Sequence, residues 1–263
     1  MTGKQKTIII TGSSSGIGFA LAARYAAPNV KLHLFGRSQV RLNLISNICL
    51  EKGAKVQIFT GNICDKYWLK EQIQNICNEN KVDLLVAAAG VSAGTIGGIE
   101  TEHQVDEIFS TNLEGALNTL MPALPFMIEN MSGHIVLFSS MAGLIPLSSA
   151  PSYSASKAAI KFFGDSLRVY LKPFKVRVSV IIPGYIDTPM TRVNNFPMPF
   201  IIPVDKATNI IIKGLEKNKG VIAFPISTYI LLKFINLLPY KLIDYINSKL
   251  PGSPAFGSKN EKE

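Results

Sequence analysis

The sequence predicts a single α/β domain in which helices cover both faces of a mainly parallel β-sheet. The chain has 263 residues, which is enough for one large core. Apolar residues make up 47% of it and charged residues 17%, as is typical of a globular protein. Short β-branched runs also alternate with segments of helical spacing. Such alternation requires right-handed crossovers, which bring the strands together in parallel.

The predicted elements follow from this alternation. Runs rich in Val, Ile and Leu predict strands at Thr7–Thr11, Lys31–Phe35, Lys55–Thr60, Val82–Ala88, His134–Ser139 and Val176–Ile182. Apolar residues three and four apart predict helices at Gly16–Ala27, Val40–Lys52, Lys66–Asn78 and Ser154–Leu171, with a long helical region around Leu113–Leu120. The Pro-rich segment Thr188–Pro203 is expected to run irregularly over the edge of the sheet.

Composition and charge narrow the possible functions. The net charge of +9 fits a phosphorylated ligand, an anionic membrane surface or simple solubility. Nucleic-acid binding is not expected, because no Lys/Arg cluster is interleaved with aromatic residues. The three cysteines and three histidines form neither a disulfide framework nor a metal-ligand pattern, so no metal is expected. No signal peptide or transmembrane segment is predicted, and a reducing, cytoplasmic location is expected.

A glycine-rich turn follows the first predicted strand and opens the first predicted helix. It reads Thr11-Gly12-Ser13-Ser14-Ser15-Gly16-Ile17-Gly18. Glycines let the backbone approach a phosphate closely, and the helix N-terminus supplies free N–H groups and a positive dipole end. The turn therefore predicts a doubly wound Rossmann fold whose dinucleotide is held by Gly12, Ser14, Ser15, Gly16, Ile17 and Gly18. The alternative is a solvent-exposed turn before a capped helix, which the preceding strand disfavours.

Tyr153 and Lys157 form a second motif. They are four residues apart on a predicted helix, so they share one face. A free phenol has a pKa of about 10, too high for proton transfer at neutral pH. A nearby ammonium and a positive nicotinamide ring both favour the phenolate. Because such a pair also arises by chance on helix surfaces, its meaning depends on the other motifs.

Those motifs, in their order along the chain, resemble the classical short-chain dehydrogenases/reductases. The resemblance runs from about Lys6 to Phe224 and includes Ser139-Ser140-Met141-Ala142-Gly143 after the fifth predicted strand. It implies that Tyr153 is the proton-transfer residue and that Ser140, thirteen residues earlier, holds the substrate oxygen. Ser139 is the rival, but the Ser-x-x-Gly match selects Ser140. Asn112 is implied to interrupt its helix and hold a water that reaches Lys157.

The resemblance also implies how the cofactor is held. Gly36 stands where relatives specific for NAD carry an acid, and Arg37 follows it, so NADP(H) is expected in preference to NAD(H). Asn62 and Ile63 are implied to contact the adenine. Small residues, Ala89 and Gly90, are implied to let the ribose lie close, although the two asparagines common before them are missing. Lys157 and Tyr153 would contact the nicotinamide ribose, and the remaining cofactor contacts would come from Pro183, Gly184, Ile186 and Thr188.

These residues predict a hydride-transferring oxidoreductase. We expect NADP(H)-dependent interconversion of a carbonyl and a secondary alcohol, in particular the reduction of a hydrophobic small molecule. The alternative is a non-enzymatic module that senses a dinucleotide with the same fold. The complete set Asn112, Ser140, Tyr153 and Lys157 disfavours that alternative, since a sensor has no need of a proton donor.

The chain is expected to have three parts. Residues 1–225 form the catalytic domain, with a substrate loop at 188–203; residues 226–251 form an apolar helical extension, and residues 252–263 a polar tail. The extension predicts two short helices divided near Pro239, which could close the core or an oligomer interface, cap the substrate cleft, or lie on the inner face of a membrane. A homodimer or homotetramer is expected through 101–130 and 154–171, which carry Leu117, Leu120, Phe162, Phe163 and Leu167.

Overall fold

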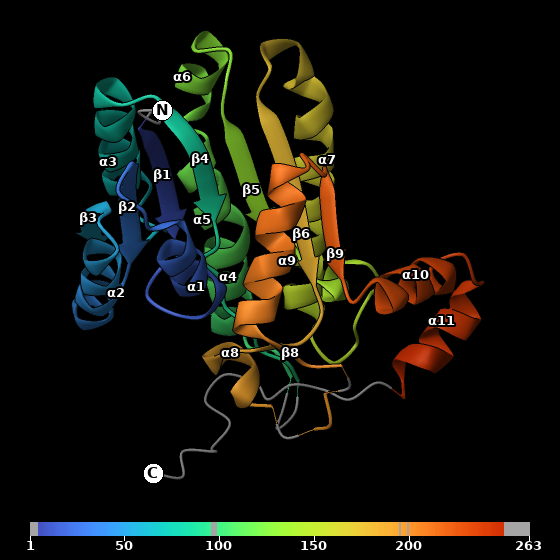
Figure 1. Cartoon of the computed structure of the whole chain (residues 1–263). Helices are drawn as coiled ribbons and strands as arrows, with labels where there is room; N and C mark the ends of the chain where they lie inside the picture. Colours follow the sequence, from blue (N-terminus) through green and yellow to red (C-terminus); the bar gives the residue numbers. More distant parts are fainter. Residues whose placement is uncertain (1–4, 96–98, 195, 199, 250–263) are drawn as a thin grey trace.

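A sheet of seven parallel strands forms the centre of the protein (Figure 1). The computed structural model describes residues 5–95, 99–194, 196–198 and 200–249. The strand order is β3-β2-β1-β4-β5-β6-β9. The strands are β1 (Lys6–Thr11), β2 (Val30–Gly36), β3 (Lys55–Thr60), β4 (Val82–Ala87), β5 (His134–Phe138), β6 (Arg177–Pro183) and β9 (Val221–Phe224). The predicted fold class is confirmed.

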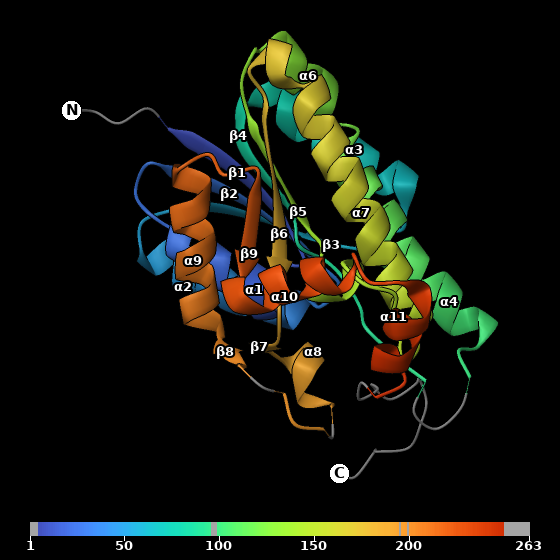
Figure 2. The same ribbon diagram turned by 90° about the vertical axis from the view of Figure 1, so that its right-hand side faces the viewer.

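Helices cover both faces of the sheet (Figure 2). On one face lie α1 (Gly16–Tyr25), α2 (Gln39–Glu51) and α9 (Val204–Glu216). On the other lie α3 (Lys66–Glu79), α4 (Glu102–Phe109), α5 (Gly115–Leu120), α6 (Leu124–Glu129) and α7 (Pro151–Tyr170). Because both faces are covered, the inner strands β1, β2, β4, β5 and β6 are buried along nearly their whole length, whereas the edge strand β3 is partly exposed.

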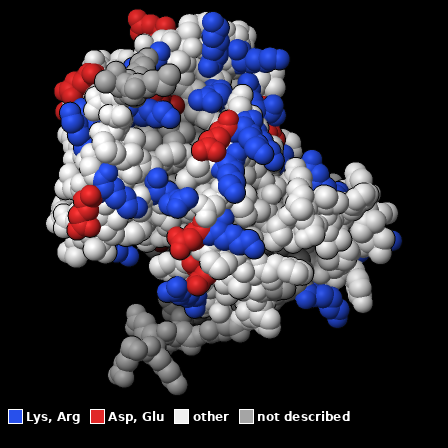
Figure 3. Space-filling view, viewed as in Figure 1, with Lys and Arg blue, Asp and Glu red and all other residues white. Residues whose placement is uncertain are grey.

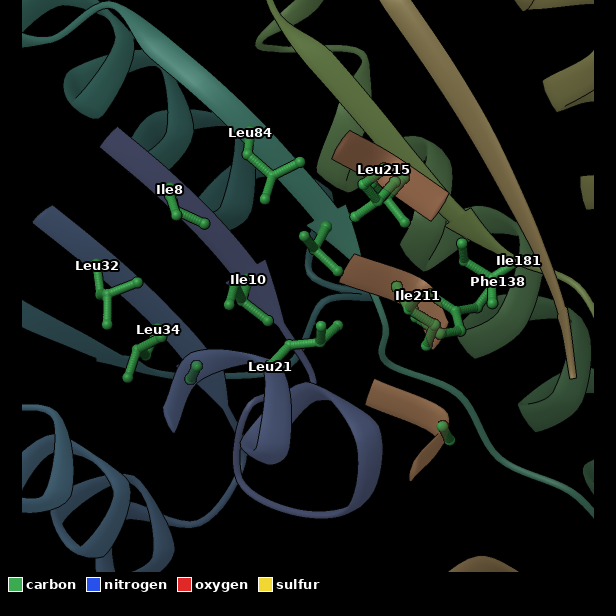
Figure 4. Close-up of a cluster of buried hydrophobic side chains, with 14 of the residues drawn as sticks. Ile8, Ile10, Leu21, Leu32, Leu34, Leu84, Phe138, Ile181, Ile211 and Leu215 are labelled. Carbon is green, nitrogen blue, oxygen red and sulfur yellow. The ribbon is translucent and has the colours of Figure 1, made fainter. Parts of the chain in front are cut away.

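Alternation along the strands divides the core into two layers. Ile8 and Ile10 of β1 face α1 and α9, where they pack with Leu21 and Ile211 (Figure 4). Ile9 points to the opposite face and packs beneath the other helix layer. This period of two follows from the pleat of a strand, and the uninterrupted β-branched run supplies both layers at once.

The chain changes direction between β1 and β4. It proceeds outward from β1 to β3, then crosses back to continue from β4 to β9. Loops leaving the carboxyl ends of β1 and β4 therefore separate to opposite sides of the sheet, which opens a crevice at this edge.

Three segments add detail to their sequence-based prediction or differ from it. Thr188–Pro203 is not wholly irregular: it contains α8 (Pro189–Arg192), and β8 (Ile202–Pro203) pairs in parallel with β7 (Ile186–Asp187). The long helical region is interrupted at Asn112, as the resemblance implied, and the interruption takes the form of a π-helical turn, Ser110–Glu114. Finally, α9 and β9 follow where no element was predicted, although Val204–Glu216 carries the 3.6-residue apolar spacing of an amphipathic helix.

The helices expected to mediate oligomerisation bury most of their apolar residues within the monomer. Leu120 and Leu167 are buried, and Leu117 and Phe163 are half-buried against the core. Only Phe162 of the five is exposed, with 68% of its surface accessible. Four of the five apolar residues therefore need no partner chain to be buried, which removes most of the support for the expectation that these helices form an oligomer interface.

The C-terminal extension projects from the carboxyl end of β9 (Figure 1). It consists of α10 (Ile226–Ile235) and α11 (Tyr240–Asn247), divided before Pro239 as predicted. No helix within the described ranges is both long enough and apolar enough to cross a membrane. The predicted polar tail, 252–263, lies outside the described residues.

Candidate active site

A cleft of about 330 Å³ lies at the carboxyl edge of the sheet. The predicted site residues that line it are Gly12, Ser14, Ser15, Gly16, Ile17, Gly18, Arg37, Asn62, Ile63, Ala89, Gly90, Ser140, Tyr153, Lys157, Pro183, Gly184, Ile186 and Thr188. Asn112 does not line it and lies behind its wall. The sequence motifs, far apart along the chain, thus meet at one place.

The glycine-rich turn takes the shape that a phosphate site requires. Gly12 has φ +70°, and a Cβ there would lie 2.6 Å from the Ala89 Cα, so only glycine fits. Gly18 is equally constrained, because its Cβ would lie 2.3 Å from the Gly12 carbonyl oxygen. Ser13 holds the turn to β2 by donating its hydroxyl hydrogen bond to the Phe35 carbonyl at 3.0 Å.

The N-terminus of α1 faces this turn without a side-chain cap. Ser15 is the N-cap residue, and within the described structure its hydroxyl accepts no hydrogen bond from the first turn. The first N–H groups of a helix have no intrahelical acceptor and carry the positive end of the dipole. They are therefore available to an anion in the cleft.

Asn112 joins three segments behind the cleft. Its Oδ1 accepts a hydrogen bond from the Val91 N–H at 2.8 Å, and its Nδ2 donates to the Val91 carbonyl at 3.0 Å and to the Ser156 hydroxyl at 3.2 Å. The π-helical turn presents the side chain at this point. The chain leaving β4 is thereby held to the helix that carries Tyr153.

Gly90 lies between Asn112 and Lys157. A Cβ at this position would lie 3.0 Å from the Asn112 Oδ1 and 3.3 Å from the Lys157 Nζ. Glycine here lets the two polar groups approach the same small space. A water bridging them stays a prediction.

The two neighbouring serines have different environments. Ser139 is buried, and its hydroxyl donates to the Lys157 carbonyl of α7 at 2.8 Å. Ser140 follows the end of β5, and its Oγ accepts the Ala142 N–H at 3.2 Å. The Ser140 O–H remains able to donate into the cleft, whereas that of Ser139 is committed to the helix backbone.

Burial acts on both members of the Tyr/Lys pair. It raises the pKa of the Tyr153 phenol above its usual range, and the Ser140 hydroxyl opposes this effect. Burial also lowers the pKa of Lys157 to about 8. The Lys157 Nζ lies 5.7 Å from the centre of the Tyr153 ring and donates to the Phe138 carbonyl at 3.1 Å. Burial therefore favours the neutral form of both side chains, relative to the same groups in water.

Glu100 contributes to the site although no motif contains it. Its carboxylate accepts hydrogen bonds from the Ser152 N–H at 3.0 Å and from the Ser152 hydroxyl at 2.9 Å. It thereby caps the first turn of α7, next to Tyr153. The contact spans 52 positions of sequence, so no local signal could reveal it.

Two arginines lie at the end of the cleft beyond β2. Arg37 follows the strand, and Arg41 lies in the first turn of α2, where the Ser38 hydroxyl accepts its N–H. Both are exposed, and neither has a carboxylate within ion-pair distance among the described residues. Sequence reasoning missed Arg41, although its position four residues after Arg37 at a helix start was the available signal.

Asn62 and Ile63 form the adjacent wall. The Asn62 Oδ1 accepts the Cys64 N–H at 3.1 Å, which leaves its amide hydrogens available. Ile63 is buried against α5, where a Cβ on Gly115 would lie 2.3 Å from the Ile63 Cδ1. Gly115 is thus required for Ile63 to lie at this depth.

Thr191 organises the opposite end of the cleft, and it too was missed. Thr188 N–H donates to the Thr191 hydroxyl at 3.1 Å, and that hydroxyl donates to the Ile186 carbonyl at 2.5 Å. Pro183 and Gly184 end β6 beside it. A capping box therefore fixes the Ile186–Thr188 segment at the cleft.

The residues present fit a nicotinamide dinucleotide. At Gly12 and Gly18 the backbone of the turn lies so close to neighbouring backbone that a Cβ would not fit. The uncapped N-terminus of α1 is suited to binding a pyrophosphate. At the far end Lys157, only 5% exposed, makes a single hydrogen bond among the described residues, which leaves two ammonium hydrogens for ribose hydroxyls.

A family profile described as "short chain dehydrogenase" matches residues 6–197. The chain belongs to the short-chain dehydrogenase family. The resemblance inferred from the motifs is thereby confirmed, and with it membership of a family of oxidoreductases.

Three known proteins illustrate the likeness. An uncharacterized oxidoreductase of Myxococcus xanthus is 34% identical over 240 residues, which cover 91% of this chain and 95% of that protein. The "11-beta-hydroxysteroid dehydrogenase-like 2" of Arabidopsis thaliana is 32% identical over 251 residues, covering 92% and 80% respectively. A short-chain dehydrogenase from Sphingobium yanoikuyae, solved in complex with NADPH, superposes with a TM-score of 0.78 at 22% identity, covering 97% and 100%; it supports the fold.

Proposed function

We propose that the protein is an NADP(H)-dependent oxidoreductase that reduces the carbonyl group of a hydrophobic small molecule and can oxidise the alcohol in reverse. The observation that carries the proposal is the meeting of Ser140, Tyr153 and Lys157 in one cleft with the uncapped N-terminus of α1. A dinucleotide bound along this cleft would supply the hydride.

The chain's own residues position the substrate and manage its proton. The Ser140 hydroxyl, which contacts the Tyr153 phenol, holds the substrate oxygen beside it. Because burial keeps the phenol protonated, Tyr153 can donate its proton as negative charge develops on that oxygen. Lys157 binds the ribose and, while charged, favours the phenolate that remains. Asn112 holds Val91 to α7, the helix that carries Tyr153. A water between Asn112 and Lys157 is part of the proposal.

Replacing Tyr153 by Phe tests the reaction. The substitution removes the phenol hydroxyl and leaves the ring in place, so turnover should fall by roughly 10²-fold or more, in line with loss of general acid catalysis. Titration of the dinucleotide by fluorescence should give nearly unchanged affinity, because the phosphate contacts lie at the α1 turn and the ribose contacts come mainly from Lys157. A variant with unaltered kcat would contradict the proposed role.

The preference for NADP over NAD rests on Arg37 and Arg41. Two exposed cations at the ribose end, which have no carboxylate partner among the described residues, suit a 2′-phosphate, which charge-assisted hydrogen bonds would hold. We expect tighter binding of NADPH than of NADH by roughly 10-fold or more, the size of one such bond. Arg37→Asp should reverse the order, since a carboxylate repels the phosphate. Equal affinities in the unaltered protein would contradict this preference.

A hydrophobic substrate is proposed from the apolar side of the cleft. Pro189 and Met190 of α8 line it beyond Thr188. The name of the Arabidopsis relative, a hydroxysteroid dehydrogenase-like protein, is consistent with this class. A panel of ketones, aldehydes and acyl thioesters of increasing chain length, assayed by NADPH oxidation, tests it. Rates that fall as the apolar part lengthens would contradict it.

The same assay addresses the alternative of a dinucleotide-sensing module. A sensor would bind NADPH and show no turnover with any substrate of the panel. The contact between a buried, protonated phenol and a serine hydroxyl facing the cleft favours the enzyme, because binding alone requires neither group.

Self-association through the outer face of α7 is also proposed. Phe162, Val169 and Tyr170 are each more than half exposed on this helix. Light scattering at micromolar concentration should give the mass of a dimer or tetramer, and Phe162→Ser should weaken it. A monomeric mass for the unaltered protein would contradict the proposal.

A further inference from the structure

The C-terminal extension exposes an apolar surface that the other described residues leave uncovered. It comprises Ile226, Ile230, Leu231, Phe234, Leu237, Leu238, Tyr240, Leu242 and Tyr245, each at least 38% exposed, which we call the hairpin patch. Contiguous apolar surface of this kind is rare on soluble proteins unless something binds it. The two helices project from the sheet and face the viewer in Figure 2.

The opposite side of the hairpin is anchored firmly. Tyr229 and Leu232 pack against Met141 and Leu144, just after Ser140. The Asn236 amide donates to the Leu144 carbonyl and the Asn247 amide to the Pro146 carbonyl. The patch is therefore the outward face of a fixed element, attached to the segment that carries the proposed substrate-binding serine.

Charge distinguishes the candidate occupants of the patch. Lys233, Lys241 and Lys249 are exposed among its apolar residues, and Asp244 is the one acidic residue of 226–249. In Figure 3 the lobe over α10 and α11 is largely uncharged, with basic side chains at its margin. The Lys233 and Lys249 ammonium groups lie 5.4 and 5.8 Å from the rings of Tyr229 and Tyr245. Lysine stems beside tyrosine rings are suited to the boundary between lipid tails and headgroups.

A second copy of the chain is a poorer match for this charge distribution. A two-fold interface would bring the patch against itself, so three lysines would meet three lysines with one aspartate on each side. An anionic lipid surface attracts the same lysines while accepting the apolar side chains.

We propose that the hairpin patch docks the protein on a phospholipid bilayer containing anionic lipids. The apolar residues would enter the boundary of the acyl chains, and the lysines would contact the headgroups. The hairpin is anchored to the segment after Ser140, so docking would bring the proposed substrate site close to the membrane surface. The docking itself requires no turnover, so its failure is distinguishable from failure of the proposed reaction.

Sedimentation with vesicles tests the proposal on the full chain. Vesicles of phosphatidylcholine, with or without phosphatidylserine, are mixed with the unaltered protein, with Leu231→Asp and with Leu44→Asp. Leu231 and Leu44 are 58% and 56% exposed, and Leu44 lies on α2, far from the hairpin (Figure 1). We expect binding to the anionic vesicles, its loss in Leu231→Asp and its retention in Leu44→Asp, with unchanged thermal melting in both.

A paired change of Lys233→Gln and Lys241→Gln measures the charge contribution. Binding to anionic vesicles should weaken about fivefold for each lysine, whereas any binding to phosphatidylcholine alone should be unaffected. Three results would overturn the proposal. They are absence of the unaltered protein from both vesicle pellets, equal loss in both aspartate variants, and self-association that Leu231→Asp abolishes without any vesicle binding.

Discussion

At the scale of single residues, two neighbouring serines make different hydrogen bonds and therefore have different roles. Ser139 and Ser140 are adjacent and both line the cleft, yet the Ser139 hydroxyl donates to the backbone of α7, whereas the Ser140 hydroxyl accepts the Ala142 N–H and acts on the Tyr153 phenol. The Ser-x-x-Gly pattern alone could not give this reason for preferring Ser140.

The two serines should therefore respond differently to alanine. Ser140→Ala should lower kcat/KM by roughly 10²-fold, as for loss of a positioned hydrogen-bond donor, and leave the melting temperature nearly unchanged. Ser139→Ala should instead lower the free energy of unfolding by about 1 kcal/mol through loss of its bond to the Lys157 carbonyl. Steady-state kinetics and thermal melting of both variants check this. The opposite pattern would mean that Ser139 holds the substrate.

At the scale of elements, the π-helical turn positions one side chain, that of Asn112. The wider turn over Ser110–Glu114 directs the Asn112 side chain toward the end of β4, where it bonds to Val91. An interruption at Asn112 was expected from the family resemblance. The partners, Val91 and Ser156, are distant in sequence and appeared only once the helices had packed.

Asn112→Ala should consequently be costly for stability as well as for activity. Three hydrogen bonds are lost and the part-buried N–H and carbonyl groups of Val91 lose their Asn112 partner, so the free energy of unfolding should fall by roughly 2–4 kcal/mol. Asn118→Ala is a matched control, because Asn118 makes one hydrogen bond, to the Ile63 carbonyl. Urea unfolding measures both. A similar loss in the two variants would contradict the role of Asn112 as a three-way link.

At the scale of the whole molecule, two histidines lie inside the sheet. His33 of β2 and His134 of β5 are buried, and burial lowers the pKa of each from 6.5 to about 4. The unfolded chain thus binds more protons than the folded one between these values, and the histidines favour folding above about pH 6.5.

The protein should therefore lose stability as the pH falls from about 6.5 to about 4. His33→Leu should make this decline shallower, because an apolar side chain of similar size cannot take up a proton. His103→Leu, an exposed position on α4, is the matched control and should leave the slope unaltered. Urea unfolding at a series of pH values measures the slopes. An unchanged slope in His33→Leu would show that His33 is not responsible.

The sequence by itself determined the parallel α/β architecture, the phosphate-binding turn and the Tyr153/Lys157 pair. These depend on local periodicity and on the backbone freedom of a few glycines, which neighbouring residues specify. Tertiary structure alone decided that Glu100 caps α7, a contact that spans 52 positions, and that the Arg37/Arg41 pair and the Thr188/Thr191 cap lie at the same cleft. It also decided which apolar residues are covered: Leu120 and Leu167 were taken into the core, while the hairpin patch was left outside. Helical spacing predicts that an apolar face will be buried, but whether the monomer has a surface to bury it depends on how all the elements pack.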